Sequence, residues 1–262
     1  MRLYVLLIAH MLADFALQTN VMARKKKKEF KFLLIHSAIY VVVMAVGCFS
    51  CMGAAPAFGM IILFGITHFL IDWGRTKYDS KYEKDSIKAL GSFLVDQVLH
   101  IGIILLACWV LRDQKQEGWI VLLAQNTELK GFLREILWEG CTLDQLLRYS
   151  LLFVTIMDPA SVLVKKLSGA VSVRKTDKGD ENGENEGDDQ EENHAGSLIG
   201  KLERLIIVLL VMYDGYGGIG LVLTAKSMAR HDRLKNQAFA ESYLVGTLSS
   251  TAIAMLLAQV LG

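Results

Sequence analysis

The hydrophobic residues of the chain are gathered into blocks of about 17–22 residues, and most charged residues lie between the blocks. A soluble domain of this length would spread its apolar residues through amphipathic patterns, whereas blocks of this length cross a bilayer as helices. We therefore predict an all-α, polytopic transmembrane helix bundle of about eight spans. The predicted spans are 3–22, 32–52, 57–73, 89–111, a fifth that ends near 164, 198–213, 219–229 and 241–261.

The loops between the blocks predict the orientation of the spans. Basic segments follow the first and third blocks, at 24–28 and 75–88, and shorter ones occur at 165–166 and 230–235. Short basic loops remain in the cytoplasm, and an even number of predicted spans separates these segments. We therefore expect a multi-pass protein of the inner (cytoplasmic) membrane with both termini outside.

The chain divides into membrane bundles and connecting segments. Thr142 and Gln145 resemble the two ends of a capping box and predict a helix start there. A tract rich in Asp, Glu, Gly and Asn predicts an acidic linker without regular structure. The predicted parts are a four-span bundle at 1–111, an outer-face interfacial segment at 112–148, the fifth span at 149–167, an acidic disordered cytoplasmic linker at 168–197 and a three-span bundle at 198–262.

Histidine and aspartate recur together inside the first four spans. Three blocks contain one pair each with a separation of four, which places both side chains on one helix face. The order of the pair is reversed in the fourth span, which runs in the opposite direction, so each aspartate lies one turn nearer the cytoplasm than its histidine. The side chains predicted to form one polar layer are His10, Asp14, His36, His68, Asp72, Asp96 and His100.

Converging carboxylates inside a bundle require compensation, because they repel one another and are costly to bury. A divalent cation, protonated histidines or protonated acids would each provide it. Imidazole nitrogen and carboxylate oxygen together suit zinc, manganese or iron better than calcium. We predict a metal site made of these seven residues, in which Asp14, Asp72 or Asp96 activates a water molecule.

The location of this site permits three hypotheses. The first is a metal-dependent membrane hydrolase that acts on a phosphoester or lipid-like substrate. The second is a cation or proton transporter or channel that uses the same residues. The third is a structural or regulatory membrane protein without catalysis, in which His–Asp hydrogen bonds join the helices and the acidic linker recruits a soluble partner.

The second half contributes candidate substrate-binding residues at the cytoplasmic ends of its helices. They would extend the polar layer of the first half into a cavity that opens to the cytoplasm. Snorkelling and pairing between helices is the alternative interpretation. The candidates are Glu203, Lys226, Arg230 and Glu241.

The charge of the chain limits the possible partners. The formal net charge is +1, and no basic segment is interleaved with aromatic residues, so we expect membrane lipids rather than nucleic acid as partners.

Cys48 and Cys51 form a C-x-x-C at the end of an apolar block, which is weak support for redox or zinc chemistry. Small packing residues near a helix end are the alternative, and Cys108 and Cys141 carry no motif.

The motifs of the first four spans also resemble a known family. They are His10-x-x-Ala13-Asp14-Phe15-x-x-Gln18, His36, His68-Phe69-x-Ile71-Asp72 and Asp96-Gln97-x-x-His100. Over about residues 1–111 the chain resembles the bacterial membrane family called domain of unknown function 3307. The resemblance implies a polytopic bacterial membrane protein and no established reaction. Its His-x-x-x-Asp pattern is similar to that of membrane-bound metal-dependent hydrolases, by analogy only.

Three motifs of the second half resemble the C-terminal half of longer members of the same family. They are Gly200-x-x-Glu203-Arg204, Thr224-Ala225-Lys226-Ser227 and Gly246-Thr247-Leu248.

Overall fold

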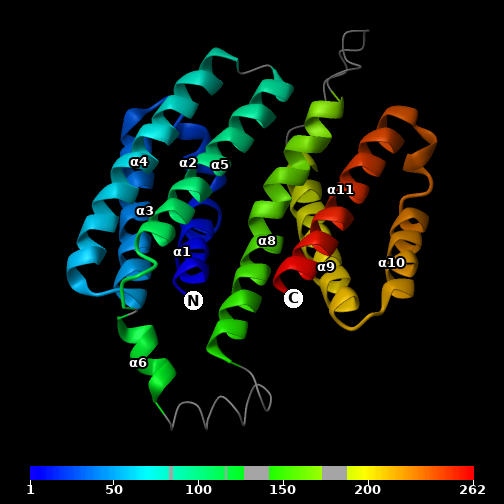
Figure 1. Ribbon diagram of the computed structural model, residues 1–262. Helices are drawn as coiled ribbons and strands as arrows, with labels where there is room; N and C mark the ends of the chain where they lie inside the picture. The colour runs from blue at the N-terminus through cyan, green and yellow to red at the C-terminus, as the bar shows by residue number, and fades with distance from the viewer. Residues whose placement is uncertain (83–84, 116, 127–141, 173–187) are drawn as a thin grey trace. The chain divides into compact units, whose positions relative to one another are not determined.

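The computed structural model is all-α, as predicted, and describes residues 1–82, 85–115, 117–126, 142–172 and 188–262 (Figure 1). The elements of the first half are α1 (Arg2–Met11), the π-helix η1 (Leu12–Ala16), α2 (Asn20–Lys25), α3 (Phe30–Cys51), α4 (Ala54–Lys81), α5 (Ser86–Val110) and α6 (Trp119–Gln125). Those of the second half are α8 (Leu143–Ser172), α9 (Asp188–Met212), α10 (Tyr216–Ala229), the 3-10 helix η3 (Arg233–Lys235) and α11 (Gln237–Leu261).

Five helices in the described part of the chain are long and apolar enough to cross a membrane. They are α3, α4, α5, residues 143–170 of α8, and α11. Large apolar side chains point outward from them, among them Val42, Ile62 and Val98 at 64%, 62% and 69% exposure. Contiguous apolar surface on this scale needs a lipid or protein environment. The chain is therefore a multi-pass membrane protein. The other three predicted spans correspond to α1–η1, α9 and α10.

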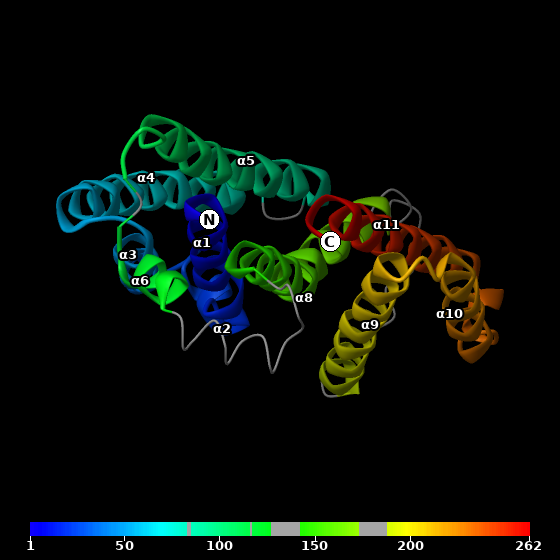
Figure 2. The same cartoon turned by 60° about the horizontal axis from the view of Figure 1, so that its bottom comes forward.

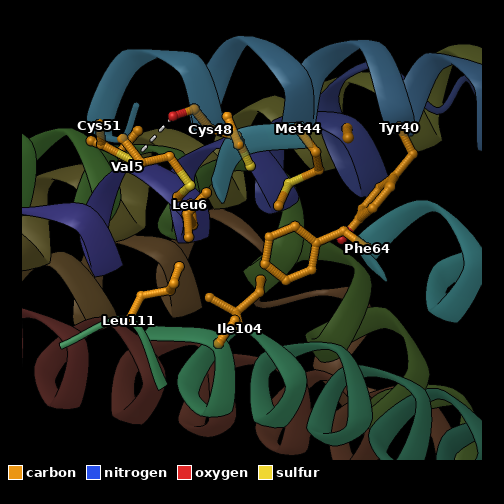
Figure 3. Packing of buried hydrophobic residues seen from close by; sticks show 14 residues of the cluster. Val5, Leu6, Tyr40, Met44, Cys48, Cys51, Phe64, Ile104 and Leu111 are labelled. Atoms are coloured by element: carbon orange, nitrogen blue, oxygen red, sulfur yellow. Dashed lines mark hydrogen bonds between the residues drawn. The ribbon is translucent and has the colours of Figure 1, made fainter. Parts of the chain in front are cut away.

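The described chain divides into two compact units, Met1–Lys84 with Gly91–Leu151, and Asp85–Leu90 with Leu152–Gly262. In the first unit, α3 packs against α1 and against α4 (Figure 2). Its apolar core contains the buried side chains of Leu6, Met44, Phe64 and Ile104 (Figure 3). These residues occupy one end of the bundle, which leaves the other end for polar side chains.

The prediction of one continuous first span over residues 3–22 is wrong. A π-helical turn follows α1, and the Leu17 N–H donates to the Leu12 carbonyl at 2.9 Å. The backbone then leaves the helix, and the Thr19 hydroxyl accepts from Met22 N–H to start α2. Ten residues in α1 and five in η1 reach about 20 Å, short of the roughly 30 Å of a hydrocarbon core. A π-turn leaves no mark in a hydropathy pattern, so the sequence did not reveal it.

Arg2 places the start of α1 at the end of the first unit where α5 finishes. Its guanidinium donates to the carbonyl oxygens of Leu111, Gln114 and Lys115. The segment α1–η1 therefore runs from that end toward the basic segment 24–28, in the direction that was predicted.

The second unit is built from α9, α10, α11 and most of α8. α9 packs against α10 and α11, and its buried residues Ile207 and Val208 meet Ile156 and Ala254 in one apolar core. The predicted capping box is confirmed, because Thr142 N–H donates to Gln145 Oε1 and Gln145 N–H donates to Thr142 Oγ1.

The helices of this half extend beyond the predicted boundaries. α8 continues to residue 172 and α9 begins at 188, so the predicted disordered linker 168–197 is helical at both ends. Residues 173–187 of the linker, and residues 116 and 127–141 of the predicted interfacial segment, lie outside the described residues.

Candidate metal centre

The seven predicted His and Asp residues meet in one buried cluster of the first unit. α1 and η1 supply His10 and Asp14, and α3 supplies His36, while α4 and α5 supply one pair each. The side chains are buried or nearly so, with Asp14 the most exposed at 9%. Because the pairs come from helices of opposite direction, the reversed order of Asp96 and His100 brings all seven to one level, as predicted.

Asp14 lies at the centre of the cluster. Its Oδ1 is 3.5 Å from His36 Nε2 and 3.8 Å from His68 Nε2, and its Oδ2 is 3.9 Å from His10 Nδ1. The amide nitrogen of Gln97 lies 3.4 Å from Oδ2. The carboxylate therefore faces three imidazoles at once.

A chain of hydrogen bonds fixes which ring nitrogens carry lone pairs. His100 Nδ1 donates to the Asp96 carbonyl at 2.8 Å, so its Nε2 accepts from His68 Nδ1 at 2.9 Å. This assignment leaves a lone pair on His68 Nε2. With the Gln18 amide as donor at 3.0 Å, the lone pair of His36 Nε2 accepts that hydrogen bond, so a metal ion bound to this nitrogen would displace Gln18.

The two Nε2 atoms of His36 and His68 lie at a distance typical of metal ligands. His36 Nε2 and His68 Nε2 are 3.3 Å apart. Tetrahedral ligands at about 2.0–2.1 Å from an ion lie about 3.3–3.4 Å from one another. With the two distances to Asp14 Oδ1, the three atoms form a triangle of the size that one ion requires.

Two further groupings meet the geometric requirement for a metal. Asp14, His68 and His100 offer ligand atoms within 4.8 Å of one another, and so do His36, His68 and Asp72. His68 belongs to both groups. The Tyr40 ring stacks on the His68 ring at 3.6 Å between centroids and 3° between planes, which holds the imidazole in place.

The three aspartates, which the sequence presented as equivalent, have different partners. Lys26 Nζ lies 2.8 Å from both oxygens of Asp72. Arg75 Nη1 donates to Asp96 Oδ2 at 2.8 Å. Among the described residues, Asp14 has no lysine or arginine within ion-pair distance, and its buried Oδ1 has no hydrogen-bond partner. Asp96 Oδ1 is also buried without a hydrogen bond, but Asp14 is the one of the three aspartates without a lysine or arginine partner in the described part of the chain.

His10 is a second buried group whose polar atoms are unsatisfied. Both of its ring nitrogens lack hydrogen-bond partners among the described residues, although the side chain is 0% exposed. The ring stacks on His100 with centroids 5.3 Å apart. A buried imidazole without partners is costly, so His10 is a further candidate ligand.

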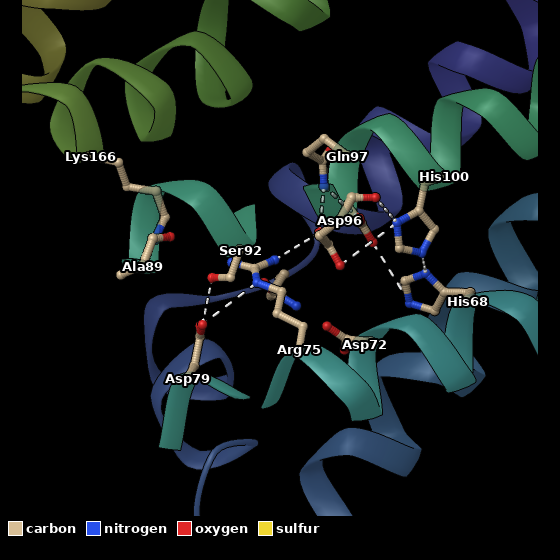
Figure 4. A network of polar contacts seen from close by, with 12 residues as sticks. His68, Asp72, Arg75, Asp79, Ala89, Ser92, Asp96, Gln97, His100 and Lys166 are labelled. Carbon is tan, nitrogen blue, oxygen red and sulfur yellow. Dashed lines mark hydrogen bonds and ion pairs between the residues drawn. The ribbon is translucent and has the colours of Figure 1, made fainter. Parts of the chain in front are cut away.

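A second polar network adjoins the cluster on the side of the basic segments (Figure 4). Arg75 connects Asp96 to Asp79, whose Oδ2 lies 3.8 Å from its Nε. Ser92 donates to Asp79 at 2.6 Å, and Lys27 lies 3.8 Å from it. Arg75 also lies over the Phe93 ring, 5.4 Å from its centroid.

The sequence pattern did not predict several residues that contact the cluster. Lys26 belongs to a run of five basic residues that the sequence offered only as an orientation signal. Tyr40 and Gln18 lie four residues after His36 and Asp14, and that spacing was a usable signal. Nothing in the spacing distinguished Arg75 from the other basic residues of its loop.

The four candidate substrate-binding residues lie in the second unit. Lys226 donates to Glu203, which is buried, and Glu241 accepts from the Gln237 amide at 3.1 Å. Arg230 follows the last residue of α10. Their assignment to substrate stays a prediction.

Cys48 and Cys51 are free, buried thiols in the apolar core of the first unit, and the Cys51 thiol donates to the Gly47 carbonyl at 3.2 Å. Among the described residues, no cysteine belongs to a possible metal group. This environment favours the packing interpretation of the C-x-x-C. Cys141 lies outside the described residues.

Fold and site together define a multi-span membrane protein with a buried His/Asp cluster that could hold a metal ion. Residues 3–129 match the family model described as "Protein of unknown function (DUF3307)", so this part of the chain is a DUF3307 domain. The match contains all seven cluster residues and extends past the predicted limit of 111. No curated protein and no solved structure matches the chain.

Proposed function

We propose that the protein is a multi-pass protein of the bacterial inner membrane that holds a divalent ion on Asp14, His36 and His68. Zinc, manganese and iron suit this mixed oxygen and nitrogen ligand set. The observation that carries the proposal is the charge on Asp14: Asp72 and Asp96 are paired with Lys26 and Arg75, whereas Asp14 has no lysine or arginine partner among the described residues.

We propose further that the centre is hydrolytic and acts on a phosphoester or lipid-like substrate at the cytoplasmic side. Three protein ligands leave a coordination position for water, as in catalytic rather than structural sites. Bound there, a divalent ion would supply Lewis acidity and a nucleophilic water at neutral pH. Asp72 Oδ2 lies 3.8 Å from His36 Nε2, close enough to the ligands to orient that water and accept its proton.

The membrane location of the whole chain belongs to the same proposal. Together with the five candidate spans, α1–η1, α9 and α10 make eight embedded segments, with both chain ends on the side opposite the basic loops. In the second unit, Glu203, Lys226, Arg230 and Glu241 are proposed to bind substrate, and the acidic linker to bind a soluble partner.

The two competing functions fit the first unit less well. Transport needs access from both faces, and the described core beyond the cluster is filled by apolar side chains such as Leu6, Phe64 and Ile104. A purely structural role would satisfy the polar groups by hydrogen bonds between helices, and Asp14 Oδ1 and both His10 nitrogens are left without any.

Metal analysis of the purified full-length protein tests the centre. We expect about one ion per chain in the wild type, and loss of the ion in Asp14→Asn and His68→Ala, because a ligand is removed in each. His231→Ala removes an exposed histidine of the second unit and is expected to retain the ion. A wild type without stoichiometric metal, or both ligand variants with full metal, would contradict the proposal.

Turnover separates hydrolysis from transport. We expect metal-dependent release of phosphate from phosphoester lipids in proteoliposomes, abolished by Asp14→Asn. Metal-dependent ion flux without any turnover would favour the transporter.

A further inference from the structure

Asp72 is placed as a metal ligand but is bound by another cation. Its Oδ2 lies 3.8 Å from His36 Nε2, and its side chain forms a possible metal group with His36 and His68. The ammonium of Lys26 lies 2.8 Å from each carboxylate oxygen. Both carboxylate oxygens of Asp72 are therefore already engaged by a positive charge.

Lys26 is buried although the helix that precedes it is not. None of the six residues of α2 is buried, whereas Lys26, directly after it, is 9% exposed. A lysine is rarely buried unless it is paired, so the ion pair with Asp72 holds the side chain inside. The side chain therefore has a specific partner at the centre.

We propose that Lys26 keeps Asp72 out of the coordination sphere of the metal and so keeps one coordination position open. This inference rests on the proposed metal centre at Asp14, His36 and His68. Without the ammonium, Asp72 would be a buried carboxylate without a counter-charge beside a divalent ion, and it would bind the ion as a fourth ligand. The site would then be closed, as structural four-ligand sites are.

Binding of azide to the cobalt-loaded, full-length protein in detergent tests the open position. Co²⁺ replaces the native ion, and a small anion that binds at an open position changes the visible spectrum of the cobalt. We expect the wild type to hold one Co²⁺ and to respond to azide. Lys26→Met should hold Co²⁺ about ten- to a hundredfold more tightly, the range over which residues around a site commonly change metal affinity, and should not respond to azide.

Two control variants separate this role from simple charge loss. Lys25→Met removes an adjacent, exposed lysine and should behave as the wild type. The double variant Lys26→Met/Asp72→Asn removes both members of the pair, leaves neither charge buried alone, and should recover the azide response. If Lys26 merely attracted the anion, the double variant would stay unresponsive, and the proposal would be overturned.

The remaining outcomes are also decisive. A wild type that binds one Co²⁺ without an azide response has a closed site, which overturns the inference even if Lys26→Met does not fold. Lys26→Met with unchanged affinity and response, or with two ions, overturns it and leaves the proposed centre standing. A wild type that binds no Co²⁺ removes the centre itself, and the inference with it.

Discussion

At the scale of single residues, the centre depends on which charged groups are neutralised inside the chain. Arg75 forms an ion pair with Asp96, as Lys26 does with Asp72. Arg75 also lies within ion-pair distance of Asp79. Breaking a buried ion pair by removing one partner costs more than removing both, because a lone charge stays buried. This difference can be measured.

Arg75→Met is expected to lower the free energy of unfolding by about 3 kcal/mol, since it leaves the Asp96 carboxylate without its cation and Arg75 is only 20% exposed. Adding Asp96→Asn should restore most of this loss. Reversible unfolding in mixed detergent measures both. Arg112→Met removes an exposed arginine and should change the stability by less than about 0.5 kcal/mol. Equal losses for Arg75→Met and Arg112→Met would show that the Asp96 pair adds no special stability.

The sequence predicted the seven cluster residues because their spacing and reversed order are properties of the chain itself. It did not predict that the three aspartates of the cluster would have different charged partners. Whether an aspartate is neutralised depends on which one of several adjacent lysines turns inward, and that choice is made by tertiary packing. Lys26 is buried while Lys25 and Lys28 are exposed, although hydropathy treats all three alike.

At the scale of elements, hydropathy located the long helices well and the irregular ones poorly. α3, α4, α5 and α11 agree with predicted spans, because their length and apolar composition are sufficient for prediction. The π-turn after α1 depends on i to i+5 hydrogen bonds, such as that from Leu17 N–H to the Leu12 carbonyl, which no composition signals. π-turns are frequent at functional sites, and this one contains Asp14.

In the second unit, Arg204 joins three helices at one buried point. It donates to the carbonyls of Ile156 and Met157 in α8. It also donates to the Ser250 hydroxyl of α11 at 3.3 Å. The planar guanidinium with several donors suits this arrangement, and an ammonium does not.

Arg204→Met and Arg204→Lys are therefore both expected to destabilise the protein, Arg204→Met by at least about 3 kcal/mol, because buried carbonyls lose charged donors. Thermal unfolding in detergent, followed by circular dichroism, measures the loss. Arg233→Met changes an exposed arginine of the same unit and should leave the transition nearly unchanged. If Arg204→Lys were as stable as the wild type, the multiple donors of the guanidinium would be dispensable.

At the scale of the whole molecule, the two units carry different kinds of polar structure. The first has a cluster in which a carboxylate and an imidazole lack partners. The second has the ion pair of Lys226 with Glu203, in which the other carboxylate oxygen of Glu203, Oε1, is buried without a hydrogen-bond partner. Among the described residues, the groups that could hold a metal ion all belong to the first unit, which is why the proposed chemistry is assigned to it. Because Lys26 of the basic segment 24–28 pairs with Asp72, the cluster lies near the membrane face at which the basic segments lie.

This placement predicts which loops are accessible from each side of the membrane. α3 begins just after Lys28 and ends just before Ala55, and α4 returns to Lys81, so Lys28 and Lys81 belong to one face and Ala55 to the other. Lysine-rich short loops remain in the cytoplasm. In a cysteine-free background, Ala55→Cys should react with a membrane-impermeant maleimide on intact cells, whereas Lys28→Cys and Lys81→Cys should react only after lysis.

The three positions are exposed, so a failure to react reports the side of the membrane and not burial. Labelling of Lys28→Cys on intact cells, with protection of Ala55→Cys, would place the His/Asp cluster near the outer face. A cytoplasmic substrate would then be excluded, although the metal centre itself could still exist. Labelling of Lys28→Cys and Ala55→Cys from the same side would mean that α3 does not cross the bilayer. The common level of His36, His68 and His100 would then need an explanation other than a membrane bundle.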